Sequence, residues 1–154
     1  MTDTNTNNKK TVPSKAHPKV TATLKQALLE FQKLAVTAKK DGKNPHFRSN
    51  YSTLESVISA VNQGNQFGLF FTQEIDYVYV SHMETKSEVV VVTTVRHVID
   101  ENTYVSKLPI IMSQANYENP QKIGSAITYA KRYTLQSVYG LSLIHISEPT
   151  RHCL

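Results

Sequence analysis

Features that define several common protein classes are scarce or absent in this sequence of 154 residues. It holds a single cysteine, Cys153, which excludes a disulfide framework and a cysteine-based metal site within the chain. No run approaches the roughly 18 apolar residues that a membrane-spanning helix needs, and residues 1–19 lack the apolar segment of a signal peptide. There is no glycine-rich phosphate loop, so ATP hydrolysis is not expected. These absences predict a cytoplasmic, reduced protein that does not enter a membrane.

The balance of charge favours cations only modestly. Lysine and arginine number 17 against 12 aspartates and glutamates, which gives a net charge of +5. Such an excess suits a polyanionic partner, but many basic proteins bind nothing of the kind, so charge alone leaves nucleic-acid binding open. Apolar residues make up 40% of the chain, enough for the core of one ordinary domain.

Composition divides the chain into three parts. Residues 1–19 are rich in Thr, Asn, Lys and Pro and too polar to order themselves, so we expect a flexible arm there. Residues 20–141 carry the periodic patterns of a folded core. The string LSLIHISEPTR, which begins at Leu141, is similar to the in-frame translation of a transposon adapter used for sequencing libraries. We therefore expect residues 142–154 to be an artefact and the natural C-terminus to be missing.

Helical periodicity predicts three helices. The first is expected over residues 21–40, where apolar residues recur every three or four positions, with Asp41-Gly42 ending it. The second starts at the capping-box spacing of residues 52–55 and ends at Gly64. The last helix opens with Pro120, because proline is favoured in the first turn.

β-Branched and aromatic residues dominate the middle of the chain. They predict strands over residues 67–75, 77–83, 88–100 and 103–108, with a turn at 84–87 and a loop over 109–119. Short turns between successive strands imply an antiparallel meander. The predicted fold class is therefore α+β, an antiparallel β-meander of three or four strands with helices covering one face.

The last helix has two chemically distinct faces. Its expected buried stripe consists of Ile123, Ile127, Ala130, Thr134 and Val138. The opposite side is hydroxylic, aromatic and cationic: Ser125, Thr128, Tyr129, Arg132 and Gln136, with Lys131 at the border. Cations neutralise phosphates by counterion release and aromatic rings stack on bases, so this side suits single-stranded DNA. A solvated helix face explains the same residues, and both explanations stay open.

Other positions also permit a functional and a structural explanation. The loop over residues 44–51 either contacts DNA or a neighbouring subunit, or folds its aromatic residues back onto the core. Gly124 and Ser125 either let a phosphate approach the helix or let the helix pack closely on the sheet. A lysine cluster either binds phosphate or compensates the dipole at the end of the first helix: Lys39, Lys40 and Lys43.

Two segments resemble the Erf (essential recombination function) family of phage recombination proteins. Residues 44–51 read N-P-H-F-R-S-N-Y and are followed by Leu54, where the family shows N-P, a hydrophilic residue, then F-K/R-S-x-Y-x-x-L. Residues 124–133 match the family's signature G-S-A-x-T-Y-x-K/R-R-Y at every fixed position. Both motifs occur in the family's order, and the resemblance covers about residues 21–141.

The resemblance implies a function that composition does not show. Such proteins bind single-stranded DNA and anneal complementary strands without ATP in phage-type homologous recombination, and they are not enzymes. It also implies a core similar to that of ring-forming annealing proteins, assembly into rings or filaments, and a partner exonuclease. A passive single-strand-binding protein, or a small metal-dependent nuclease, is the alternative function.

Site residues follow from the two motifs and from the lysine cluster of residues 39–43. The expected DNA contacts are Lys131, Arg132, Tyr129, Ser125, Arg48 and Lys43. Three aromatic residues are expected in the core or at a subunit interface: Phe47, Tyr51 and Tyr133. The strand over residues 88–100 and the last helix are expected to line the DNA groove.

Signals of catalysis are weak. Asp76, Glu84 and Lys86 loosely resemble the D…E-x-K arrangement of metal-dependent nucleases, but Glu84 and Lys86 fall in a predicted turn, away from a strand-centred cleft. The histidines outside residues 142–154 show no metal-ligand spacing: His17, His46, His82 and His97. No catalytic residue, metal site or cofactor is predicted.

Overall fold

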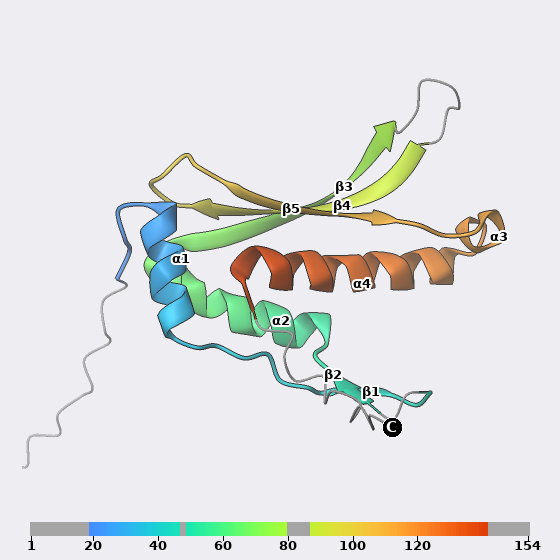
Figure 1. Ribbon diagram of the computed structural model, residues 1–154, viewed down its shortest axis with the longest axis horizontal. Coiled ribbons are helices and arrows are strands. Elements are labelled where there is room, and N and C mark those ends of the chain that lie inside the picture. Colours follow the sequence, from blue (N-terminus) through green and yellow to red (C-terminus); the bar gives the residue numbers. More distant parts are fainter. Residues whose placement is uncertain (1–18, 47–48, 80–86, 142–154) are drawn as a thin grey trace, which may run out of the picture.

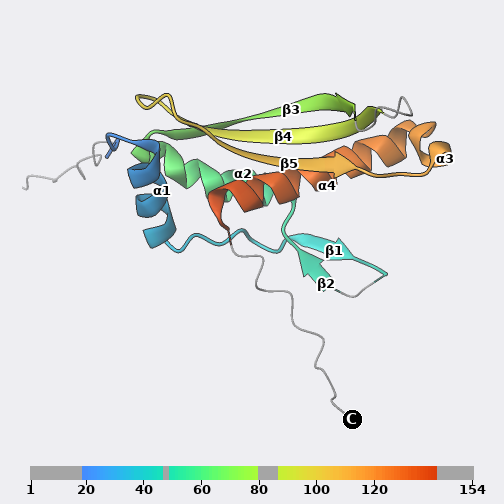
Figure 2. The same ribbon diagram turned by 45° about the horizontal axis from the view of Figure 1, so that its top comes forward.

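A three-stranded antiparallel sheet lies on a layer of helices (Figure 1). The computed structural model describes residues 19–46, 49–79 and 87–141. The sheet consists of β3 (Leu69–Tyr79), β4 (Ser87–His97) and β5 (Tyr104–Ile110), in the order β3-β4-β5. The helices α1 (Leu24–Lys33), α2 (Leu54–Val61) and α4 (Pro120–Tyr139) all lie on one side of it (Figure 2). The α+β class and the meander of three strands are confirmed.

Smaller elements complete the chain. A two-stranded hairpin of β1 (Gly42–Asn44) and β2 (Ser49–Tyr51) precedes α2. The 3₁₀ helix η1 (Asn62–Phe67) joins α2 to β3, and the one-turn helix α3 (Gln114–Tyr117) joins β5 to α4. Residues 44–51 and 109–119 were predicted as loops, so the hairpin, α3 and the last two residues of β5 are corrections.

The predicted first and second strands form one continuous strand, β3. Asp76 lies in its middle, pairs with Val90 of β4 and accepts a hydrogen bond from its own neighbour, the backbone N–H of Tyr77. Asp76 is exposed at the edge of the sheet, where a carboxylate keeps its water. The division at Asp76 was therefore wrong.

The last helix matches its prediction in extent. Asn119 caps it by accepting hydrogen bonds from the backbone of Gln121 and Lys122, Pro120 occupies the first turn, and Gly140 ends it with a left-handed φ of 64°. Its buried face is broader than the predicted stripe, because both the sheet and α2 pack against its C-terminal half. Gln136 was expected on the solvent side and is only 6% exposed, which corrects that assignment.

Two apolar clusters hold the layers together. The larger joins α1, α2, the sheet and the end of α4, and includes Phe31 and Tyr139, whose rings meet edge to face at 5.2 Å. The smaller lies under the other end of the sheet and contains Val91, Ile110 and Ala130. These clusters fix α4 against β4 and β5 along its length.

The first helix is much shorter than predicted. It ends at Lys33, and Ala35 adopts a left-handed φ of 49°, which a helix cannot continue through. Periodicity placed Leu34 and Ala35 on the buried stripe of a longer helix, but both are exposed. Val36 and Ala38 pack against the larger cluster instead, from an irregular segment.

Helix α2 begins at Leu54, and its capping differs from the predicted box. Thr53, not Ser52, is the N-cap and accepts from the backbone N–H of Ser56. The carboxylate of Asp41 accepts hydrogen bonds from the backbone N–H and hydroxyl of Thr53 and from the hydroxyl of Ser56. Asp41 thus supplies the carboxylate role that Glu55 was expected to fill.

The second helix also ends earlier than predicted. It stops at Val61, and Gly64 lies inside η1 instead of ending the helix. Gly68, with φ at 91°, makes the left-handed turn into β3. In the part of the chain described here, no helix is both long and apolar enough to cross a membrane.

Candidate nucleic-acid interface

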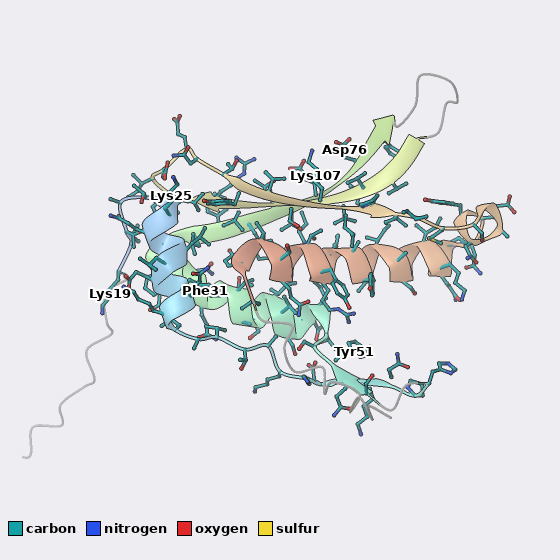
Figure 3. The ribbon with its side chains drawn as sticks, viewed as in Figure 1. Lys19, Lys25, Phe31, Tyr51, Asp76 and Lys107 are labelled. Atoms are coloured by element: carbon teal, nitrogen blue, oxygen red, sulfur yellow. The ribbon has the colours of Figure 1, made fainter. Side chains whose placement is uncertain are left out.

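The two segments singled out in the sequence meet at Arg132. Its guanidinium carbon stands 4.7 Å from the centre of the Tyr51 ring, and its Nη1 donates a hydrogen bond to the backbone oxygen of Ser52 at 3.3 Å. Tyr51 lies at the end of the hairpin nearest α4 (Figure 3). Residues 80 positions apart in the chain therefore share one site.

Two further tyrosines of α4 surround the same guanidinium. Its carbon lies 5.5 Å from the ring centre of Tyr129 and 5.3 Å from that of Tyr133. The two rings lie 4.3 Å apart, tilted by 35°. Hydrogen bonding with Tyr133, followed by partial burial, raises the pKa of Tyr129 above its usual range, so the Tyr129 phenol stays neutral near pH 7. We call Tyr51, Tyr129, Tyr133 and Arg132 the tyrosine–arginine cluster.

The cluster opens onto solvent. Tyr129 is 52% exposed and Tyr51 is 40% exposed, so both present part of an apolar ring to solvent. Tyr133 and Arg132 are half-buried beneath them. An exposed aromatic face beside a cation offers a partner both stacking and charge.

A glycine brings the hairpin against this cluster. Gly42 pairs with Tyr51 across β1 and β2, and a Cβ added to Gly42 would come within 2.5 Å of the Tyr51 ring. Only a residue without a side chain lets the ring lie there. Gly42 had been assigned to the end of the first helix, so the sequence did not reveal this contact.

The other predicted DNA contacts lie around the cluster. Lys131 is half-buried, and its backbone oxygen accepts a hydrogen bond from Gln73 of β3 at 2.8 Å. Lys43 is exposed on β1, and Ser125 is exposed on α4. Lys33 and Glu30 form the one ion pair within the described ranges, so no carboxylate there compensates the charges of Lys43, Lys131 or Arg132.

Three structural explanations left open by the sequence are now decided. A Cβ on Gly124 would meet no atom within 4 Å, so close helix packing does not explain this glycine. Because α1 ends at Lys33, its dipole does not explain the lysine cluster of residues 39–43. Tyr51 contacts Arg132 instead of capping the apolar core.

Strand β4, which was expected to line the DNA groove together with the last helix, packs directly on α4. Thr93 of β4 and Thr134 of α4 approach to 2.6 Å between their hydroxyl oxygens, and Val91 packs on Ala130. These facing side chains are in direct contact and line no groove, and a DNA groove lined by both elements stays a prediction. The tyrosine–arginine cluster lies instead where α4 meets Tyr51 and Ser52 of the hairpin end.

Several predicted residues fall outside the described ranges. Phe47 and Arg48 belong to the first motif, and Glu84 and Lys86 to the nuclease-like pattern. The remaining residue of the nuclease-like pattern, Asp76, is described and lies exposed on β3. Within residues 19–46, 49–79 and 87–141, no three His, Cys, Asp or Glu side chains gather as metal ligands would.

Comparison with known proteins shows the family of this chain. The model of the ERF superfamily matches residues 24–143, which include both motifs and every element from α1 to α4. No curated protein and no solved structure shows a significant match.

Proposed function

The chain belongs to the ERF superfamily, a family of phage recombination proteins of the annealing type, and we propose that it binds single-stranded DNA and anneals complementary strands without ATP. The observation that carries the proposal is the tyrosine–arginine cluster, because both family motifs contribute to it. Annealing requires a protein to hold a strand without occupying the base edges that must pair.

The chemistry of the cluster fits that requirement. Stacking on the exposed ring of Tyr129 engages the face of a base and leaves its pairing edge open. Lys131 and Lys43 supply positive charge for the phosphates, which any sequence presents equally. Neither interaction reads sequence, so the site suits strands of any composition.

An annealing assay separates the candidate functions. Two complementary oligonucleotides, each with one dye, are mixed without ATP, and pairing is followed by energy transfer. We expect the protein to accelerate pairing. Binding and nuclease protection without faster pairing would favour a passive single-strand-binding protein, and magnesium-dependent cleavage would favour a nuclease.

Matched variants connect the activity to the cluster. Tyr129→Ala should slow annealing, because it removes the most exposed ring of the cluster. Leu29→Ala is the control, since Leu29 is also 52% exposed and lies on α1, which contributes no residue to the cluster or to either edge strand. Equal losses in both variants would disconnect the cluster from annealing.

Self-assembly is a second part of the proposal. The edge strands β3 and β5 have no further partner among the described residues, and large apolar side chains are exposed on them: Ile75, Tyr77 and Val105. Glu74 and Lys107 occupy the same transverse row of the sheet, through Val92. Asp76 and Lys107 both lie toward the outer side of the sheet (Figure 3).

This arrangement supports head-to-tail pairing of the β5 edge of one copy with the β3 edge of the next. The basic residue of one edge then meets the acidic residues of the other, and a heterologous contact of this kind builds rings or filaments. Light scattering should report particles much larger than a dimer, and Lys107→Glu should reduce them. A wild-type monomer at saturating protein on long single strands would contradict assembly. A partner exonuclease stays a prediction.

A further inference from the structure

The surroundings of Arg132 differ from those of an arginine that binds phosphate. Its guanidinium is half-buried, lies within 5.5 Å of three tyrosine rings and already donates to the backbone oxygen of Ser52. A phosphate contact would require the planar donor group to face outward. Here the surrounding rings and the carbonyl already occupy much of its surface.

The contacts of Arg132 form a continuous series from the hairpin to α4. The backbone of Gly42 lies against the Tyr51 ring, Tyr51 lies against Arg132, and Arg132 lies against Tyr129. The Tyr133 ring also packs against Tyr129, with 4.3 Å between the two ring centres. Tyr129 is the most exposed member of this series.

From this geometry we infer that Arg132 is a positioning residue, which holds the Tyr129 ring in a fixed orientation for stacking on a base of single-stranded DNA. Tyr51 and Gly42 brace the guanidinium from the hairpin side. Lysines around the cluster neutralise the phosphates, Lys131 first among them. The identity of the ligand rests on the proposed function, but the positioning of Tyr129 by Arg132 is a property of the protein alone.

The two roles of an arginine differ in their dependence on salt. A side chain that neutralises one phosphate contributes about 0.7 to the slope of log affinity against log salt on single strands. A side chain that orients an aromatic ring alters affinity and leaves that slope unchanged. Fluorescence anisotropy with a labelled oligo-dT across a salt series measures both quantities for each folded variant.

The expected pattern identifies each role. Tyr129→Ala should lower affinity about 5- to 150-fold, the range for one base stacked on an aromatic ring. Arg132→Gln should lower affinity at least threefold with the wild-type slope, and should add little to Tyr129→Ala in the double variant. Lys131→Ala should reduce the slope by about 0.7.

Gly42→Ala tests the brace without changing any charge. The added methyl group would collide with the far end of the Tyr51 side chain, not with backbone, so the ring moves and the fold survives. Affinity should fall in the same direction as in Arg132→Gln, again with an unchanged slope. Arg96→Gln is the charge-matched control, because Arg96 is exposed on β4 away from the cluster.

A measurement without DNA decides the positioning role independently. The protein is labelled with 3-fluorotyrosine, and the ¹⁹F resonance of Tyr129 is assigned as the one lost in Tyr129→Phe. Arg132→Gln and Gly42→Ala should shift or broaden that resonance, Arg132→Lys should restore part of its position, and Arg96→Gln should leave it unchanged.

Two outcomes overturn the inference. One is a Tyr129 resonance that is unaffected by Arg132→Gln in a folded protein. The other is a slope reduced by about 0.7 in Arg132→Gln together with losses that add to those of Tyr129→Ala, which would make Arg132 a phosphate contact. A wild-type protein that fails to bind oligo-dT refutes the proposed function instead, and the ¹⁹F result still decides whether Arg132 orients Tyr129.

Discussion

Replacing Thr93 by valine is expected to destabilise the protein, because its hydroxyl is the middle member of a buried chain of hydrogen bonds. Gln73 Nε2 donates to Thr93 Oγ1 and to the backbone oxygen of Lys131, both at 2.8 Å. Thr93 Oγ1 lies 2.6 Å from Thr134 Oγ1, which donates to the backbone oxygen of Ala130 at 2.9 Å. Since Thr134 uses its proton for Ala130, Thr93 donates to Thr134.

The magnitude follows from the groups that lose a partner. Thr93 is 0% and Thr134 is 2% exposed, so water cannot replace either hydroxyl. Thr93→Val leaves one N–H of Gln73 without an acceptor, and a buried donor left unpaired costs about 1–3 kcal/mol of unfolding free energy. Thr134→Val leaves the Thr93 hydroxyl without an acceptor, at a cost in the same range.

The double variant should cost less than the two single variants together. With both hydroxyls gone, the N–H of Gln73 is the one group that has lost its partner, as in Thr93→Val alone. We therefore expect the double variant to match Thr93→Val, so the coupling free energy equals the cost of Thr134→Val, about 1–3 kcal/mol, inside the usual range for residues in contact.

Urea unfolding followed by circular dichroism measures these differences. Thr94→Val is the control, because Thr94 lies on the same strand but its side chain makes no hydrogen bond with any described residue. Its free energy of unfolding should change by less than about 0.5 kcal/mol. Additive single variants, or an equal loss in Thr94→Val, would refute the assignment of these hydrogen bonds.

Three further predictions concern stability. Hydrogen bonds from Ser56 and Thr53 lower the pKa of Asp41 to about 2. The stabilisation that the charged carboxylate provides is therefore complete above about pH 4 and is lost as the pH falls through about 2. The urea midpoint should drop over that range in the wild-type protein, and less so in Asp41→Asn. Gly124→Ala should raise the melting temperature by the equivalent of about 0.5–1 kcal/mol, since its surroundings are open and alanine favours a helix; a lower melting temperature would contradict this. Deleting residues 142–154 should leave melting temperature and oligo-dT affinity unchanged, and a loss above about 1 kcal/mol would show that they belong to the fold.

The sequence predicted elements correctly where residues close together in the chain determine the structure. Pro120 and Gly140 bound α4, and the β-branched run from Val89 to Val95 lies entirely within β4. Proline in a first turn and glycine after a last turn act within a few residues, so sequence predicts them well. The order of strands followed from their short connections for the same reason.

Errors arose where distant packing overrides the local pattern. Leu34 and Ala35 continue the helical spacing of α1, yet both are exposed, and Val36 and Ala38 pack on the core from an irregular segment. Asp76 suggested a break, yet an edge strand tolerates an exposed carboxylate. Gln136 has a polar side chain, yet the packing of α2 against α4 buries it. Each case depends on a partner that the sequence does not place beside the residue.

In the candidate site, too, the sequence predicted the residues but not how they are arranged. The motifs identified Arg132, Tyr129 and Tyr51, but the sequence gave no means of knowing that the guanidinium lies between rings from both segments. That arrangement changes the expected chemistry of Arg132 from a phosphate contact to a group that orients an aromatic ring. Residue type predicts which kind of partner a site suits, whereas the role of each residue depends on its neighbours.

The pair Asp41-Gly42 explains how the first motif is held in place for that role. Asp41 accepts hydrogen bonds from Thr53 and Ser56 at the start of α2, and Gly42 accommodates the ring of Tyr51 two positions before Thr53. Neighbouring residues thus fix both the helix start and the ring, and the backbone oxygen of Ser52 between them receives Arg132. A segment fixed on both sides loses little conformational entropy when a ligand binds to it. The two residues taken as the end of a helix therefore serve to hold the hairpin end against α4.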